Sequence, residues 1–219
     1  MKLKLLALTL LTTTIMFSQI NYNKLRKYYL VNKNNDTTFV YGKKLPIVKL
    51  QSGFTIFDDN GKRTFEKVNP DNFINLIYKL DNGEMKTLKS MPAIVHKSFY
   101  PYNNVFMTIL IENTNEDLKK GKVDFYLQEH KGGSPGVMGP NGMFMGSFSV
   151  DMKILYFKDT LGMHRINYKY HFKRYPKLLG KKLFKEMVKS KKDRIQFLTD
   201  YFNKYNKSID IKEDLKTNN

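Results

Sequence analysis

Short strand patterns separated by turn residues follow one another from Tyr28 to about residue 160. Segments rich in Val, Ile, Tyr, Phe and Thr, bounded by Gly, Asn, Asp and Pro, are typical of antiparallel strands. Asn60-Gly61 and Asn82-Gly83 each lie between two such segments, and Asn and Gly best tolerate the positive φ of a type I′ hairpin turn. The pattern predicts a mainly antiparallel β-sheet or a partly open barrel.

The middle of the predicted sheet is marked by VFMTILIE at residues 105–112, which is apolar nearly throughout. Such a run is typical of a strand that is buried on both faces. The following segment NTNEDLKKG, residues 113–121, favours a turn or one short helix. It leads into the strand pattern VDFYLQEH, which begins at Val123.

The composition changes after residue 160, where lysine and arginine dominate. Residues 165–194 contain twelve Lys or Arg and only two acids. In KKLFKEMVK, residues 181–189, the apolar side chains share one side of a helical wheel; they are Leu183, Phe184, Met187 and Val188. A second helix is predicted by an apolar stripe of Ile195, Leu198, Phe202 and Tyr205.

These patterns predict an α+β protein with two or three C-terminal helices. We expect a β-rich domain over residues 19–160, a helical segment over 161–209 that packs on it, and a flexible tail over 210–219. The tail is predicted because its sequence is polar and terminal.

The N-terminus, residues 1–18, has the composition of a secretory signal peptide. Two lysines precede thirteen largely apolar residues, and Ser18 lies at a plausible cleavage position. The chain contains no cysteine, which excludes a lipoprotein signal and disulfides. We therefore predict an exported protein that is periplasmic, envelope-associated or secreted, and that is not a lipoprotein.

The net charge of the whole chain is +18, and removal of residues 1–18 with their two lysines would leave +16. Such a charge favours binding to polyanions. The candidate polyanion-binding residues lie on the polar side of the first predicted helix: Lys181, Lys182, Lys185 and Lys189. An anionic glycan or lipid surface is the expected partner, and nucleic acid is not, because an exported protein seldom meets it. The alternative is an amphipathic helix whose lysines simply face water.

A glycine-rich segment, residues 131–146, separates the last two strong strand patterns. It holds six of the thirteen glycines and three of the eleven methionines of the chain. Flexible backbone and soft apolar side chains suit a loop that folds over a partner. Its candidate partner-binding residues are Met138, Met143, Phe144 and Met145. The alternative is a long connection that packs these side chains on its own sheet.

The same segment contains a formal G-x-S-x-G match around Ser134, followed by Asp151 and by His164 or His171. Pro135 has no N–H to serve as an oxyanion donor, so the match fails on mechanism. The four histidines lack metal-ligand spacing and are expected at the surface or at its boundary. The sequence predicts no catalytic residue, no cofactor and no metal site.

Four short segments carry a resemblance to a known family: Asp36 to Lys43, Phe65 to Phe73, Gly121 to Tyr126, and residues 202–206. With a signal peptide ending FSQ, the chain resembles a family of exported proteins from Bacteroidota-type bacteria. That family carries a GDT-x-x-x-G-K opening, a K-x-Y-x-P segment, a G-x-L-x-x-Y strand and a closing helix ending Tyr-Asn. Asn35 stands where the family has glycine, and the family's cysteine-containing segment is missing here. The resemblance implies export and fold, and it implies no activity.

Together these features predict a non-catalytic module that binds a protein or envelope component through residues 131–146 and the adjacent sheet. The first alternative is polyanion binding through the basic helix. The second is a hydrolase whose site is assembled by tertiary contacts.

Overall fold

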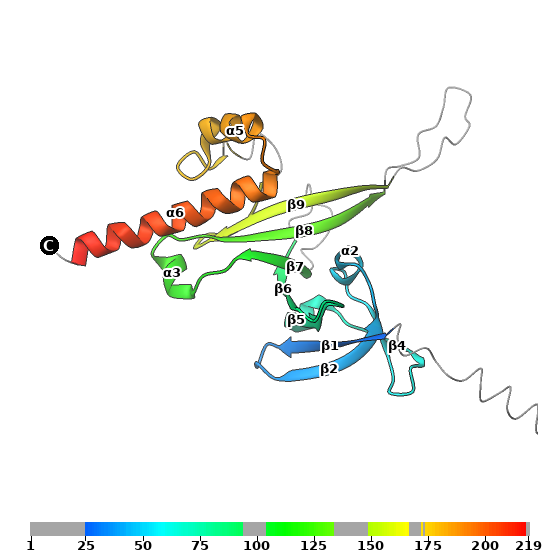
Figure 1. Cartoon of the computed structure of the whole chain (residues 1–219). Helices are drawn as coiled ribbons and strands as arrows, with labels where there is room; N and C mark the ends of the chain where they lie inside the picture. The colour runs from blue at the N-terminus through cyan, green and yellow to red at the C-terminus, as the bar shows by residue number, and fades with distance from the viewer. Residues whose placement is uncertain (1–24, 94–103, 134–148, 167–171, 173, 218–219) are drawn as a thin grey trace, which may run out of the picture.

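A computed structural model describes residues 25–93, 104–133, 149–166, 172 and 174–217. Its ten strands form one antiparallel sheet in the order β10-β9-β8-β7-β6-β5-β1-β2-β3-β4 (Figure 1). The predicted α+β class is confirmed. The sheet is open, with β10 and β4 at its two edges, and is not a barrel.

The strands in chain order are β1 (Leu25–Asn32), β2 (Thr37–Lys43), β3 (Thr55–Phe57), β4 (Arg63–Lys67), β5 (Phe73–Lys79), β6 (Met85–Pro92), β7 (Asn104–Ile111), β8 (Asp124–Gly133), β9 (Ser149–Asp159) and β10 (Gly162–Arg165). The helices are α2 (Ile47–Leu50), α3 (Asn115–Lys119), α5 (Gly180–Lys189) and α6 (Arg194–Thr217), with a 3-10 turn η2 at Pro70–Asn72. β7 is a central strand, as predicted, and α3 is the short helix expected over residues 113–121.

One face of the sheet, called here the core face, carries the two larger hydrophobic cores. Residues opposite one another in an antiparallel pair lie on the same face. The pairing registers therefore place a single row on the core face across six strands: Leu30, Leu76, Leu88, Thr108, Leu127 and Leu155.

The N-terminal core packs on this face at β1, β5 and β6. Tyr28 lies in it with its ring centroid 4.5 Å from that of Phe54. Gly42 permits this packing, because a Cβ at that position would lie 2.7 Å from the Phe54 ring. The Tyr28 hydroxyl also donates to the carbonyl of Lys43 at 2.9 Å, which fixes the end of β2.

The C-terminal core packs on the same face at β8 and β9, where α6 runs alongside the strands with α5 beside it (Figure 1). Asn206 of α6 is buried, and its side-chain amide forms two hydrogen bonds with the backbone of Val123. Its Oδ1 accepts the Val123 N–H, and its Nδ2 donates to the Val123 carbonyl, both at 2.9 Å. Lys122 forms ion pairs with Asp117 and with Asp210 of α6. The hydrogen bond from Lys122 lowers the pKa of Asp117 to about 2. These contacts join the helix to the β7–β8 connection.

The opposite face of β6 to β10 carries a third, smaller core. It consists of Met91, Ala93, Met107, Tyr126, Ile154 and Tyr156. The Tyr156 hydroxyl donates to Oε1 of Gln128 at 2.8 Å, and burial raises the pKa of Tyr156 to about 12.

The hairpin predictions at Asn60-Gly61 and Asn82-Gly83 are confirmed, but the predicted turn type is wrong. Only the glycine of each pair has positive φ, 72° for Gly61 and 90° for Gly83. In the first, the Gly61 N–H donates to the Asp58 carbonyl, and the Asp58 N–H donates to the Lys62 carbonyl. This is a three-residue loop, a type I turn followed by a left-handed residue. The β1–β2 turn has the same bonds, with Asn35 at φ 66° in the left-handed position where the resembling family has glycine.

Two predicted boundaries need correction. The sheet continues past residue 160, because the turn after Asp159 adds β10 to its edge. The segment from Asp210 is not a frayed tail, since α6 continues to Thr217. Asp210 and Glu213 form ion pairs with Lys122 and Lys120, and these contacts join the last turns of the helix to the β7–β8 connection.

A first prediction concerns Gly53, which follows α2 with φ +88°, and where a Cβ would lie 2.0 Å from the Val68 carbonyl oxygen. Gly83 is a matched control, because its φ is +90° and its nearest neighbour would be a flexible Lys79 atom at 3.8 Å. We expect Gly83→Ala to lower the free energy of unfolding by about 1–2 kcal/mol, and Gly53→Ala by at least about 2 kcal/mol more. Urea denaturation measures both, and equal losses would contradict the close approach.

A second prediction concerns Asn206. Asn206→Ala leaves the buried Val123 N–H without its acceptor, so the free energy of unfolding should fall by about 1–3 kcal/mol. Asn203→Ala removes an exposed amide of the same helix and should change it by less than about 0.5 kcal/mol. Similar losses in the two variants would show that the Asn206 amide does not hold α6.

A third prediction is a loss of stability at alkaline pH. The pKa of Tyr156 is raised from 10.0 to about 12, so its stabilising contribution is complete below pH 10 and is lost as the pH rises through 12. The free energy of unfolding should fall over this interval by about 2–3 kcal/mol from this group. Denaturation of Tyr156→Phe should show a smaller decline, and an identical decline would exclude Tyr156 as its source.

Candidate functional site

The predicted polyanion-binding residues lie on α5 as expected. Lys181, Lys182, Lys185 and Lys189 are all exposed. Within the described part of the chain none of the four forms an ion pair. Successive lysines four residues apart lie about 6 Å apart along a helix. The three at 181, 185 and 189 therefore form a row of cations on one side of α5.

The other side of α5 packs against the C-terminal core. Leu183 is buried, and the Phe184 ring lies 5.1 Å from that of Phe172 in an edge-on arrangement. Met187 is half-buried. Val188, predicted on the same apolar side, is instead 65% exposed. The helix is thus held by its apolar residues, and its lysine row faces outward.

The predicted partner-binding residues Met138, Met143, Phe144 and Met145 lie outside the described residues. What is described is the hairpin that leads to them. β8 and β9 pair without a break from Asp124 opposite Lys158 to Gly133 opposite Ser149. Ser134 and His171 of the rejected hydrolase motif also lie outside the described residues.

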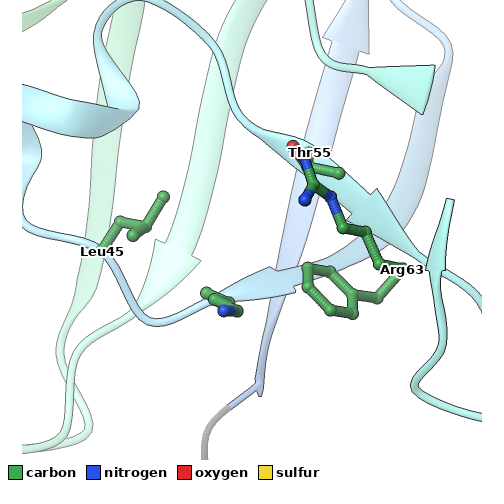
Figure 2. A pocket seen from close by; sticks show the side chains of 5 residues that line it. Leu45, Thr55 and Arg63 are labelled. Atoms are coloured by element: carbon green, nitrogen blue, oxygen red, sulfur yellow. The ribbon is translucent and has the colours of Figure 1, made fainter. Parts of the chain in front are cut away.

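A shallow pocket lies on the N-terminal strands, a site that sequence reasoning missed. Its volume is about 250 Å³, and it is lined by Lys43, Leu45, Thr55, Phe57 and Arg63. In Figure 2 the Arg63 side chain extends toward Thr55, and Leu45 lies across the pocket from them. The lining combines two cations, two apolar side chains and a hydroxyl, so it suits a small ligand with both an anionic and an apolar part.

Strand pairing creates this pocket from three consecutive strands, β2, β3 and β4, and the residues that follow β2. Tyr41 of β2 is opposite Phe57 of β3, and Phe57 is opposite Arg63 of β4. The loop between β3 and β4 is held by Asp58, whose Oδ1 accepts the N–H groups of Asn60 and Lys62. The available signal was the alternation within these short strands, but the pairing that aligns them is not visible in the sequence.

A second cluster joins the β9–β10 turn to the segment before α5. Nε2 of His164 lies 2.8 Å from Oδ1 of Asp159, and its Nδ1 lies 3.0 Å from the Tyr175 hydroxyl. In the neutral ring, the proton on Nε2 donates to the carboxylate, and Nδ1 accepts the phenol O–H. Burial raises the pKa of Tyr175, which keeps that phenol protonated. His164 is half-buried, in agreement with the boundary position predicted for it.

This cluster holds structure together through hydrogen bonds and ring packing. The Phe157 ring lies 4.7 Å from the His164 ring and 5.0 Å from the Tyr175 ring. The acid beside His164 is Asp159. Among the described residues, no group of three or more potential ligands is placed to hold a metal ion.

Comparisons with models of protein families, with curated proteins and with solved structures give no match. In the described part of the chain, no helix has the length and apolar character needed to span a membrane. The resemblance to exported proteins therefore stays a prediction from the sequence.

Proposed function

We propose that this protein is a non-catalytic binding module whose α5 lysine row attaches it to an anionic polymer or surface. The observation that supports this most directly is the exposure of Lys181, Lys182, Lys185 and Lys189 without ion-pair partners among the described residues. Other lysines close to the C-terminal core, such as Lys120, Lys122 and Lys192, do have acidic partners.

The ligand class follows from charge and from the predicted export. A row of lysines attracts any polyanion and releases its counterions on binding, so the affinity depends strongly on salt. The predicted signal peptide favours an anionic glycan or lipid headgroup of the cell envelope. The segment over residues 131–146 stays a second proposed contact with a protein or envelope partner.

The test is retention of the mature protein on immobilised heparin and on phosphatidylglycerol vesicles at increasing salt. We expect wild-type protein to be retained at low salt and released at moderate salt. The triple variant Lys181→Glu, Lys185→Glu and Lys189→Glu should lose retention at low salt. Heparin and vesicles together distinguish a glycan from a lipid surface.

The matched control reverses three exposed lysines of another helix, α6: Lys204→Glu, Lys207→Glu and Lys212→Glu. Both triple variants carry the same net charge, so only a localised site separates them. We expect the α6 variant to keep most of the wild-type retention. Equal loss of retention in the two variants would show that only the net charge of the protein matters. Full retention of the α5 variant would rule out the lysine row as the binding site.

A further inference from the structure

The N-terminal strands carry an aromatic and basic surface on the side opposite the core face. Tyr28 and Leu30 are buried in the N-terminal core, so their strand neighbours face the other way. The registers align Tyr29 with Phe39 on that side. We call the surface the aromatic face and define it by Lys27, Tyr29, Phe39, Tyr41, Lys43, Thr55, Phe57 and Arg63.

Phe39 and Tyr41 form one part of the aromatic face. Their rings pack edge-on at 6.0 Å, and the Lys27 ammonium lies 3.7 Å from the Phe39 ring centre. Phe39 is 52% exposed. Lys27 already covers one side of the Phe39 ring, whereas Phe57 lines the pocket, so Phe57 is the better platform for a ligand.

The charge of this surface has one sign. Strands β1 to β4 contain a single acid, Glu66, which does not line the pocket. Arg63 and Lys43 are exposed, and neither forms an ion pair in the described part of the chain. Asp58, the nearest turn acid in sequence to Phe57, is occupied by backbone N–H groups. An anion at the pocket therefore meets two cations without a competing carboxylate from these strands.

Pocket size limits the ligand. Pockets for drug-sized molecules measure roughly 300–1,000 Å³, and this one measures about 250 Å³. Its size suits one six-membered ring with an anionic substituent. The apolar C–H face of a pyranose packs well on an aromatic ring, and guanidinium groups bind carboxylates with paired hydrogen bonds.

We propose that the aromatic face binds an acidic sugar residue. The pyranose ring lies on Phe57, and its carboxylate lies between Arg63 and Lys43. Thr55 supplies a hydroxyl for the sugar hydroxyls. This site is separate from the α5 lysine row. It recognises a sugar ring that carries a carboxylate, whereas the lysine row recognises negative charge alone.

The test is an NMR titration of the full mature protein with a disaccharide that contains one glucuronate. The ligand control is the same disaccharide with its carboxylate reduced to an alcohol. We expect saturable shifts of the Thr55, Phe57 and Arg63 amides with the acidic ligand, and at least tenfold weaker binding of the reduced one. The α5 triple variant should bind the acidic disaccharide like the wild type, so this proposal and the proposed function can fail separately.

Two pairs of variants localise the site. Arg63→Gln should weaken the acidic ligand at least tenfold, whereas Lys62→Gln removes the same charge one residue away and should stay within twofold of wild type. Phe57→Leu should weaken both ligands, whereas Phe65→Leu, at an exposed position outside the pocket, should weaken neither. If Phe57→Leu fails to fold, the comparison of Arg63→Gln with Lys62→Gln, both at exposed positions, still tests the site.

Three results would overturn the proposal. One is the absence of saturable shifts with the acidic disaccharide at millimolar concentration. Another is equal affinity of wild type and Arg63→Gln for that ligand. The third is tighter binding of a nucleoside monophosphate than of the acidic disaccharide, which would assign the aromatic face to nucleotides.

Discussion

Alternation of side chains along each strand is the constraint on which both faces of this protein depend. Every second residue of a strand faces the same side of the sheet, and paired residues of neighbouring strands share a side. The register of each pair therefore decides which residues of the next strand face the core. The row from Leu30 to Leu155 puts both larger cores on one side. The same rule turns Tyr29, Phe39, Tyr41 and Phe57 to the other side. The core and the aromatic face are therefore two results of one register.

The two long helices, α5 and α6, cover one end of the sheet, and this limits where ligands can bind. α5 and α6 pack on β8 and β9 through the C-terminal core, and Asn206 joins α6 to the backbone of Val123. The apolar side of α5 packs against this core, so its lysine row faces outward. At the other end, β1 to β4 have their core on one face only. The two proposed surfaces lie at these two ends and differ in chemistry.

Local sequence was a good guide to the strands, helices and hairpins, and a poor guide to turn geometry. Asn60-Gly61 and Asn82-Gly83 lie in hairpins as predicted, yet only Gly61 and Gly83 adopt positive φ. Asn is equally suited to the penultimate position of a type I turn, where its side chain can accept a nearby N–H, as Asn82 does from Glu84. The same dipeptide thus fits two turns, and loop length decides between them. In the polar tail, the ion pairs of Asp210 and Glu213 with distant lysines extend a helix that composition alone would end.

The sequence by itself determined the antiparallel β class, the position of the C-terminal helices and the exposed lysines of α5, because hydrophobic periodicity is a local property of the chain. Only the tertiary structure decided that β1 pairs with β5, so that β2, β3 and β4 extend the sheet outward. That pairing is non-local, and nothing in either strand specifies it alone. The pocket of Lys43, Phe57 and Arg63 and the contact of Tyr175 with His164 join residues that are closer in sequence, but they too depend on how segments pack. Their side chains meet because separate segments pack together, and no spacing in the sequence encodes that meeting.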